Sequence, residues 1–405
     1  MTLRAEREQF GSRVLGPILA EFSLRLLMTA RALPADSQIL FCARGGLRLH
    51  VFFRRFLRRI GEPAPLPLDD LMISRLAAAR GALLKRAPAA LDEIGREFEG
   101  ATNASALAAL AQTPVEASAS TGEQFEIQSF LRLLESTAPA AVEARWLIAA
   151  QAALFDDHFQ AKRSRTHVVL CDTGLYGSTL RLMMANYPGV PLHCVMLARA
   201  NYKGFDESHF ARTLGLIVER NSYSALDRRS AVLRYWQFIE DVCEPPLDSV
   251  KVFARDPSGT PRSNLERDGW GDLVTADARG FFTGALEYLS QLSPGGYGER
   301  LARDASDAWR EFKRRIVWPT AADRKLLAVN GRGRDFGRDE EMDAFAPEAA
   351  PSWSALRASL WREGAAAALP AGLGGVLQVG LEAAQIAKQA RRGLAPLLRI
   401  AGARR

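Results

Sequence analysis

Apolar residues recur every three or four positions over residues 1–32, a spacing that predicts an amphipathic helix. Pro34 ends this helix, and the run QILFC at 38–42 then has the length and apolar character of a buried strand. The letters ARGG follow at 43–46, and helical spacing resumes over 47–60. This part of the chain therefore predicts a strand, a glycine turn and a helix.

The middle of the chain alternates between helical and strand-like patterns. Residues 69–163 are rich in alanine and leucine at helical spacing, which predicts a helical insertion. Short apolar runs at 167–171 (HVVLC), 191–197 (PLHCVML) and 213–218 (TLGLIV) predict three further strands. Strands that alternate with helices predict an α/β fold with a largely parallel sheet.

After residue 222 we expect a helix over 226–239, a short strand at 249–253 with a turn at 256–259, and helices over 272–330. The segment 331–353 mixes charges of both signs and is typical of a solvated loop. These patterns predict four regions. They are an N-terminal helix at 1–34, an α/β domain at 35–260, a helical C-terminal region at 261–379 and a basic amphipathic tail at 380–405.

Composition and charge narrow the classes of protein. The 405 residues are 48% hydrophobic and 24% charged, which is typical of a globular protein with a sizeable core. The net charge of +7 is concentrated at 388–405, where six basic residues and no acidic one occur. Without those six, 47 basic residues stand against 46 acidic ones, so we expect no sequence-specific nucleic-acid binding. The tail can dock on the body, meet a partner helix or contact an anionic membrane surface, and docking is preferred.

Cysteine usage and the first residues favour the cytoplasm. Four widely spaced cysteines without a C-x-x-C pair indicate neither a disulfide framework nor a zinc site. The charged residues 1–10 do not resemble a secretory signal. The longest uncharged run, 364–381, is too short and too rich in alanine and glycine for a membrane span.

The segment 168–180 carries the richest candidate chemistry. A strand delivers the carboxylate of Asp172 at its carboxyl end, and a loop of small residues then opens a helix. Backbone N–H groups at Gly177, Ser178 and Thr179, with two hydroxyls, suit a phosphate monoester because a helix N-terminus favours anions. The lysine of a nucleotide-binding P-loop is absent, and position 174 lacks the second aspartate of a haloacid-dehalogenase nucleophile loop.

The earlier turn at 43–46 offers a different kind of phosphate contact. Gly45 and Gly46 allow close approach of the backbone to a ligand, and Arg44 supplies a fixed cation, a combination suited to pyrophosphate. Taken singly, each of the two segments is equally consistent with an ordinary strand-to-helix turn.

Together the two segments resemble the type I phosphoribosyltransferases. ILFCARGGL at 39–47 is similar to the pyrophosphate loop of that family, and VVLCDTGLYGSTL at 168–180 is similar to its signature for phosphoribosyl pyrophosphate. The resemblance implies a phosphoribosyltransferase-type sheet and a magnesium ion that bridges pyrophosphate and ribose oxygens, with Asp172 as an indirect metal contact. It assigns the pyrophosphate to Arg44, Gly45 and Gly46, and a ribose hydroxyl to Asp172. It assigns the 5′-phosphate to Tyr176, Gly177, Ser178 and Thr179, and it implies that Thr173 and Gly174 also bind the substrate.

The function implied by this resemblance is that of a glycosyltransferase of nucleotide metabolism. Such an enzyme would bind phosphoribosyl pyrophosphate or a related 5-phosphoribosyl compound. It would transfer the phosphoribosyl group to an acceptor, which the sequence does not identify. The resemblance implies that Arg44 and Asp172 are the catalytic residues. The alternatives are a non-catalytic sensor of the same ligand and a surface-polysaccharide biosynthesis protein that acts on another sugar phosphate.

The chain departs from the family pattern in three ways. Cys171 stands at the first acidic position, Tyr176 stands where a threonine is usual, and 128 residues separate Arg44 from Asp172.

Outside the two loops, other candidates have weaker claims. Cys171 on a core strand is expected to be a buried, inert thiol, and His50 to lie at the surface or at the edge of the core. Arg199 and Lys203 follow a strand at its ligand-facing end, with Tyr202 between them, and the preferred interpretation is a solvated loop.

Overall fold

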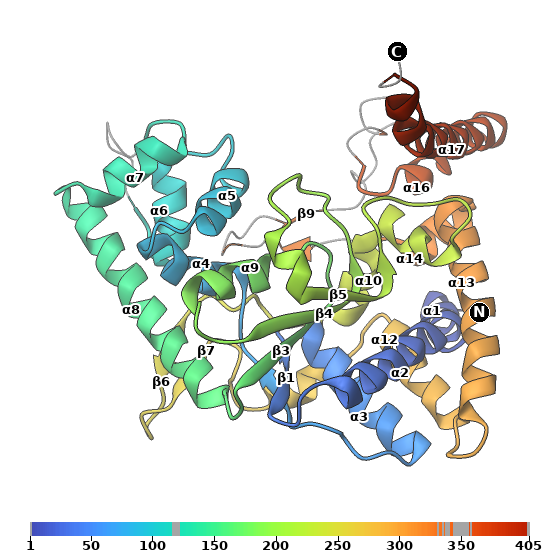
Figure 1. Ribbon diagram of the computed structural model, residues 1–405, viewed down its shortest axis with the longest axis horizontal. Helices are drawn as coiled ribbons and strands as arrows, with labels where there is room; N and C mark the ends of the chain where they lie inside the picture. The colour runs from blue at the N-terminus through green and yellow to red at the C-terminus, as the bar shows by residue number, and fades with distance from the viewer. Residues whose placement is uncertain are drawn as a thin grey trace.

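A computed structural model describes residues 2–115, 122–329, 332–333, 336, 341–342, 356 and 359–402, with the backbone alone described at 332–333, 341–342, 371 and 388–402. At its centre lies a five-stranded, all-parallel sheet in the order β2-β1-β3-β4-β5 (Figure 1). The expected α/β fold with a parallel sheet is therefore confirmed. The strands are β1 (Ser37–Cys42), β2 (Leu68–Leu71), β3 (His167–Asp172), β4 (Leu192–Arg199) and β5 (Thr213–Glu219).

Helices cover both faces of the sheet because successive side chains of a buried strand point to opposite faces. On β1, Ile39 and Phe41 belong to one hydrophobic cluster, whereas Leu40 and Cys42 belong to another. The first cluster contains side chains of the N-terminal helices and of the helices after residue 230. The second contains side chains of the helices between β2 and β3. The sheet is thus the middle layer of three.

The insertion between β2 and β3 is helical, as expected, and forms one end of the molecule (Figure 1). Its helices are α4 (Arg75–Leu84), α5 (Pro88–Glu97), α6 (Asn103–Ala111), α7 (Ile127–Glu135) and α8 (Pro139–Lys162). The expected start of the insertion at residue 69 is wrong, because residues 68–71 pair with β1 as an edge strand. Oδ1 of Asp70 in this strand lies 2.7 Å from Nδ1 of His50. Oδ1 of Asp69 accepts from Nζ of Lys162 at 3.1 Å, so both acidic residues of the strand have partners within the chain.

The first and last helical regions, assigned to separate regions from the sequence, pack against each other at the opposite end (Figure 1). The N-terminal helix is α1 (Leu3–Phe10), a π-helical turn at Gly11–Leu15 and α2 (Gly16–Ala32). The later helices are α11 (Trp270–Thr275), α12 (Phe281–Tyr288), α13 (Tyr297–Val317) and α14 (Ala321–Leu327). Phe10 of α1 packs edge-on against Phe281 of α12, with ring centroids 6.0 Å apart.

Between the sheet and these helices, the expected helix over 226–239 is divided into a 3-10 segment (Arg228–Arg234) and α10 (Trp236–Cys243). The expected strand at 249–253 begins only at its last residue, as β6 (Phe253–Arg255), which pairs antiparallel with β7 (Pro261–Ser263). The turn between them is as expected, and Oδ1 of Asp256 accepts from the backbone N–H of Ser258 at 2.9 Å.

The tail begins earlier than expected, as α17 (Ala371–Gly402), preceded by α16 (Arg362–Ala366). Gln378 donates to the carbonyl oxygen of Pro319 at 2.9 Å, and the Tyr223 hydroxyl donates to Glu382 at 2.6 Å. The first part of the tail therefore docks on the body. The side chains of 388–405, on which the membrane-surface alternative depends, lie outside the described residues.

Two smaller points complete the fold. Of the expected solvated loop at 331–353, β8 (Arg332–Gly333) and β9 (Glu341–Met342) pair antiparallel, and most of the rest lies outside the described residues. Among the residues that the structure does describe, none of the helices combines the length and the apolar character that crossing a bilayer requires.

Candidate functional site

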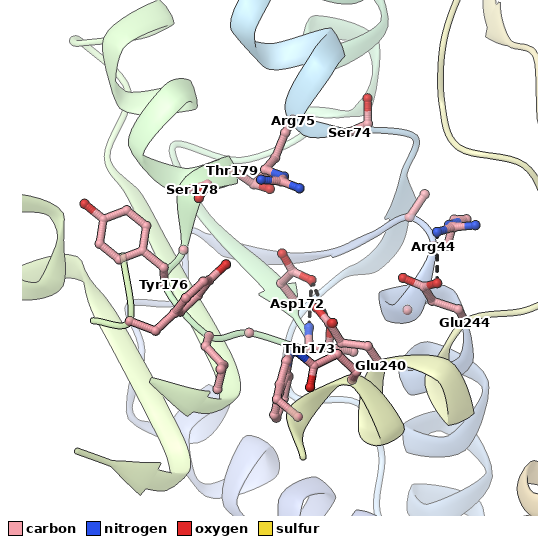
Figure 2. Close-up of a pocket in the computed structure, with 18 of the residues that line it drawn as sticks. Arg44, Ser74, Arg75, Asp172, Thr173, Tyr176, Ser178, Thr179, Glu240 and Glu244 are labelled. Carbon is pink, nitrogen blue, oxygen red and sulfur yellow. Dashed lines mark hydrogen bonds and ion pairs between the residues drawn. The ribbon is translucent and has the colours of Figure 1, made fainter. Parts of the chain in front are cut away.

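The two loops singled out from the sequence meet at one cavity. The chain passes from β1 outward to β2 and from β3 in the opposite direction to β4, so the strand order reverses between β1 and β3. In open parallel sheets, ligands bind outside the carboxyl ends of the strands at this kind of reversal. Here a cavity of about 410 Å³ is lined by residues 43–45 after β1 and 172–179 at the end of β3 (Figure 2).

Gly45 and Gly46 are required by packing between the two loops. A Cβ at Gly45 would lie 2.6 Å from Cγ2 of Thr173, and a Cβ at Gly46 would lie 2.9 Å from the carbonyl oxygen of Cys171. Gly45 lines the cavity, whereas Gly46 is buried outside its lining. Atoms of the chain itself thus occupy the space that a side chain would need at either glycine. Contact of Gly45 with a ligand stays a prediction, whereas Gly46 does not reach the cavity.

One end of the cavity has the features of an anion site. Helix α9 (Ser178–Asn186) begins there, after Gly177 in the left-handed conformation at φ +76°. Ser178 and Thr179 in its first turn line the cavity, as predicted. Arg75, at the start of α4 in the insertion, lines the same end (Figure 2). The positive end of a helix and a guanidinium thus face one space.

Lys203 adds a second cation to this end. Its Nζ donates to Oγ of Ser178 at 2.7 Å and lies 2.5 Å from a carboxylate oxygen of Glu93. The Lys203 and Glu93 side chains are only 2% and 1% exposed. Burial, with the nearby charge of Arg75, lowers the pKa of Lys203 to about 8, although Glu93 opposes the shift. The expected solvated position for Lys203 is therefore wrong.

The side chain of Tyr176 packs behind the loop that precedes α9, on the side away from the cavity. Its ring is 1% exposed, and its hydroxyl donates to the carbonyl oxygen of Asp206 at 2.5 Å. The carbonyl oxygen of Tyr176 lies 2.6 Å from Nε2 of His209. Burial raises the pKa of the Tyr176 phenol to about 12, so the phenol is neutral at ordinary pH. The hydroxyl of Tyr176 holds the loop in place, and the backbone is the part suited to a ligand.

Asp172 lies between the two ends of the cavity, and its carboxylate points into the open space in Figure 2. Its Oδ1 accepts from the backbone N–H of Thr173 at 2.7 Å. The preceding residue, Cys171, is fully buried on β3, and burial raises the pKa of its thiol well above the usual value. The expected buried thiol is therefore confirmed, and Cys171 presents no negative charge.

The other end contains Arg44 and one face of α10. Nη2 of Arg44 lies 2.9 Å from Oε2 of Glu244, and Nη1 donates to the carbonyl oxygen of Leu247 at 3.1 Å. Glu240, one turn before Glu244, and Trp236, another turn earlier, line the same wall. This end therefore carries the carboxylates of Glu240 and Glu244 close to Asp172, with Arg44 beside Glu244 (Figure 2).

Other residues considered from the sequence have structural roles. Arg199 donates to the carbonyl oxygens of Phe210 and Thr213, both at 2.8 Å. His50 pairs with Asp70 and stacks on Phe41 with ring centroids 4.5 Å apart, which places it at the edge of the core as expected.

Sequence reasoning missed five charged residues of the site or its support: Arg75, Glu93, Arg234, Glu240 and Glu244. The i, i+4 spacing of Glu240 and Glu244 was a usable signal, since it places both on one helix face. Arg75 and Glu93 belong to the insertion, and nothing in their local sequence connects them to a loop about 100 residues away.

Comparison with models of known protein families gives no match for this chain, and comparison with curated proteins gives no similar sequence.

Proposed function

We propose that this protein binds a 5-phosphorylated ribose compound in the cavity at the ends of β1 and β3, and that it transfers the phosphoribosyl group from phosphoribosyl pyrophosphate to an acceptor. The observation that supports this proposal is the convergence of the two predicted loops, 128 residues apart in the chain, on one cavity at the reversal of strand order. The likeness to the phosphoribosyltransferases rests on the two sequence motifs alone.

In the proposed complex, the 5′-phosphate lies at the start of α9. The backbone N–H groups there point outward because no preceding turn accepts them, and they favour an anion. Arg75 and Lys203 provide positive charge at the same place. These two cations share one buried carboxylate, that of Glu93, so a positive charge remains. Together with the helix N-terminus, this charge suits a phosphate dianion better than a neutral hydroxyl group.

Asp172 is then placed to accept hydrogen bonds from ribose hydroxyls, and Arg44 to hold the pyrophosphate. In the transfer, the bond between ribose C1 and the pyrophosphate oxygen breaks as the bond to the acceptor forms, and pyrophosphate leaves with the electron pair. The contribution of the protein is positioning and charge stabilisation, with no covalent nucleophile. Magnesium remains a prediction from the resemblance. In the described parts of the chain, no group of three or more His, Cys, Asp or Glu side chains could hold a metal ion, and the proposal places no step on one.

The second candidate function is a sensor that binds the same ligand without transferring it. The observation that favours it is the buried, neutral thiol of Cys171 at a position where the resemblance leads one to expect a carboxylate. With one carboxylate fewer, the ribose is held mainly through its phosphate. A protein of this kind would keep its affinity and lack turnover.

A thermal-shift panel with and without magnesium tests the proposed ligand. Ribose 5-phosphate and phosphoribosyl pyrophosphate should each raise the melting temperature, since a ligand at 100 times its Kd adds about 2.7 kcal/mol of stability. Ribose should have no effect, and hexose phosphates should have less. A response to hexose phosphates alone would replace the proposal with the surface-polysaccharide alternative, and no response to any phosphate would refute it. Pyrophosphate release in the presence of candidate acceptors then separates a transferase from a sensor.

A further inference from the structure

The cation at the Arg44 end of the cavity already has an anionic partner. The Arg44 guanidinium contacts Glu244 at 2.9 Å and the carbonyl oxygen of Leu247 at 3.1 Å. The Arg44 and Glu244 side chains are 19% and 20% exposed, so the pair is sheltered and still open to the cavity that both residues line. Figure 2 shows the two side chains facing each other on the wall beside Asp172.

This pairing opposes the binding of a second phosphate group. A carboxylate on Arg44 uses the N–H groups that a phosphate would need, because a guanidinium recognises both anions through the same planar donors. A pyrophosphate that displaced Glu244 would also leave that carboxylate close to the incoming negative charge. Glu240 and Asp172 line the cavity nearby and add to the repulsion.

The two ends of the cavity are therefore unequal. At the α9 end, Lys203 donates to the hydroxyl of Ser178. Both cations of this end pair with Glu93, which lies 2.5 Å from Nζ of Lys203 and 3.7 Å from Nη1 of Arg75. The Glu93 carboxylate is buried and is not among the residues lining the cavity. At the Arg44 end, the carboxylate of Glu244 lines the cavity itself. An anion at the α9 end therefore has no cavity-lining carboxylate to displace, whereas an anion at the Arg44 end has to take the place of Glu244.

We propose, building on the proposed function, that Glu244 determines the specificity of the site by competing with ligand phosphates for Arg44. A sugar bearing a single phosphate binds to the arrangement seen in the structure. A pyrophosphate-bearing sugar binds by displacing Glu244 from Arg44, and it loses affinity by the cost of that exchange. The preferred ligand class is thus a sugar phosphate monoester. Glu244 sets the ratio between the affinity for this monoester and the affinity for the pyrophosphate-bearing sugar.

Calorimetric titration of full-length variants with ribose 5-phosphate and with phosphoribosyl pyrophosphate tests this role. In Glu244→Gln, the affinity for phosphoribosyl pyrophosphate should rise by about tenfold relative to that for ribose 5-phosphate, a change equivalent to about 1.4 kcal/mol. Asp248→Asn is the matched control, because it removes one exposed negative charge four residues further along the chain. This control should leave the ratio of affinities as it is in the wild type.

A second pair of variants checks the mechanism. Glu244→Asp, which draws the carboxylate back by one methylene, should shift the ratio in the same direction by a smaller amount. Adding Arg44→Ala to Glu244→Gln should abolish the gain, since the freed cation is what the pyrophosphate uses. If Glu244→Gln fails to fold, the shift in Glu244→Asp still decides the test.

The outcomes separate this inference from the proposed function. An unchanged ratio in Glu244→Gln, or an equal change in Asp248→Asn, would show that Glu244 only ties α10 to the start of α3 (Gly45–Ile60). Absence of ribose 5-phosphate binding in the wild type would instead overturn the proposed function itself.

Discussion

The variant Asp172→Asn is expected to lose phosphoribosyl transfer by about 100-fold or more while it still binds ribose 5-phosphate. The carboxylate is the acidic group that β3 delivers into the cavity, and it lies between the phosphate loop and Arg44. An amide of the same shape removes the negative charge that would orient the ribose hydroxyls. It leaves the residues from Gly177 to Thr179 in place, so the phosphate retains its donors.

Two measurements on Asp172→Asn check this expectation: pyrophosphate release in the presence of an acceptor, and calorimetry with ribose 5-phosphate. Thr173→Val is a useful control, because it removes the neighbouring hydroxyl and keeps the carboxylate. Unchanged transfer in Asp172→Asn would remove Asp172 from the reacting centre. Loss of all binding with the fold preserved would show that the phosphate does not lie at the start of α9.

The affinity for ribose 5-phosphate is expected to fall by up to tenfold per pH unit above about pH 8. The pKa of Lys203 is lowered to about 8 in the unliganded protein, so its positive charge is complete below that pH and is lost above it. The second pKa of a phosphate monoester is about 6, so the ligand stays a dianion throughout this range. The expected fall in affinity is therefore caused by deprotonation of the protein and not by a change in the charge of the ligand.

Stability without ligand should change in the opposite direction. Between pH 8 and 10.5, the usual value for lysine, the unfolded chain holds more protons at Lys203 than the folded one does. Stability from this group therefore rises with pH in that range. Titrations and urea unfolding from pH 7 to 10 should show both trends, and Lys203→Arg, which stays charged, should flatten both. An affinity that is independent of pH in the wild type would exclude Lys203 from the phosphate site.

Four of the five strands were predictable from the sequence because each is a continuous apolar run that is buried on both faces. The run from Val168 to Cys171 is completely buried, and its register with β1 and β4 places Asp172 at the carboxyl edge. The remaining strand, β2 (Leu68–Leu71), was missed because its sequence LDDL has two acidic residues and only four positions. The two acidic side chains of this strand pair with Lys162 and His50, so no apolar run marks it.

Because β2 was not predicted, the part of the site that follows it in the chain was not predicted either. Arg75 begins a helix just after β2, so it reaches the same edge of the sheet as the residues that follow β1 and β3. The contact between Glu93 and Lys203 joins the insertion to the loop after β4 across 110 residues. No periodic pattern encodes a contact of that range, because it depends on how the insertion folds back over the sheet.

The roles of the glycines and of Tyr176 were also beyond the sequence. A glycine after a strand is consistent with a ligand nearby or with a packed neighbour, and only the structure shows that Thr173 occupies the space at Gly45. Tyr176 lies in the predicted loop, and its hydroxyl bonds to Asp206 in a segment 30 residues away. In both cases the local sequence predicts that a loop is present. Which atoms the residues of that loop contact depends on tertiary packing.

The most direct test of the proposed function is calorimetric titration of the wild type, Thr179→Glu and Thr179→Gln with ribose 5-phosphate. A glutamate in the first turn of a helix is compatible with the helix dipole, so Thr179→Glu should fold and place a carboxylate where the phosphate is proposed to lie. The account predicts saturable binding to the wild type, measurable binding to Thr179→Gln and none to Thr179→Glu. Equal affinity in Thr179→Glu and Thr179→Gln, or no binding to the wild type, would contradict it.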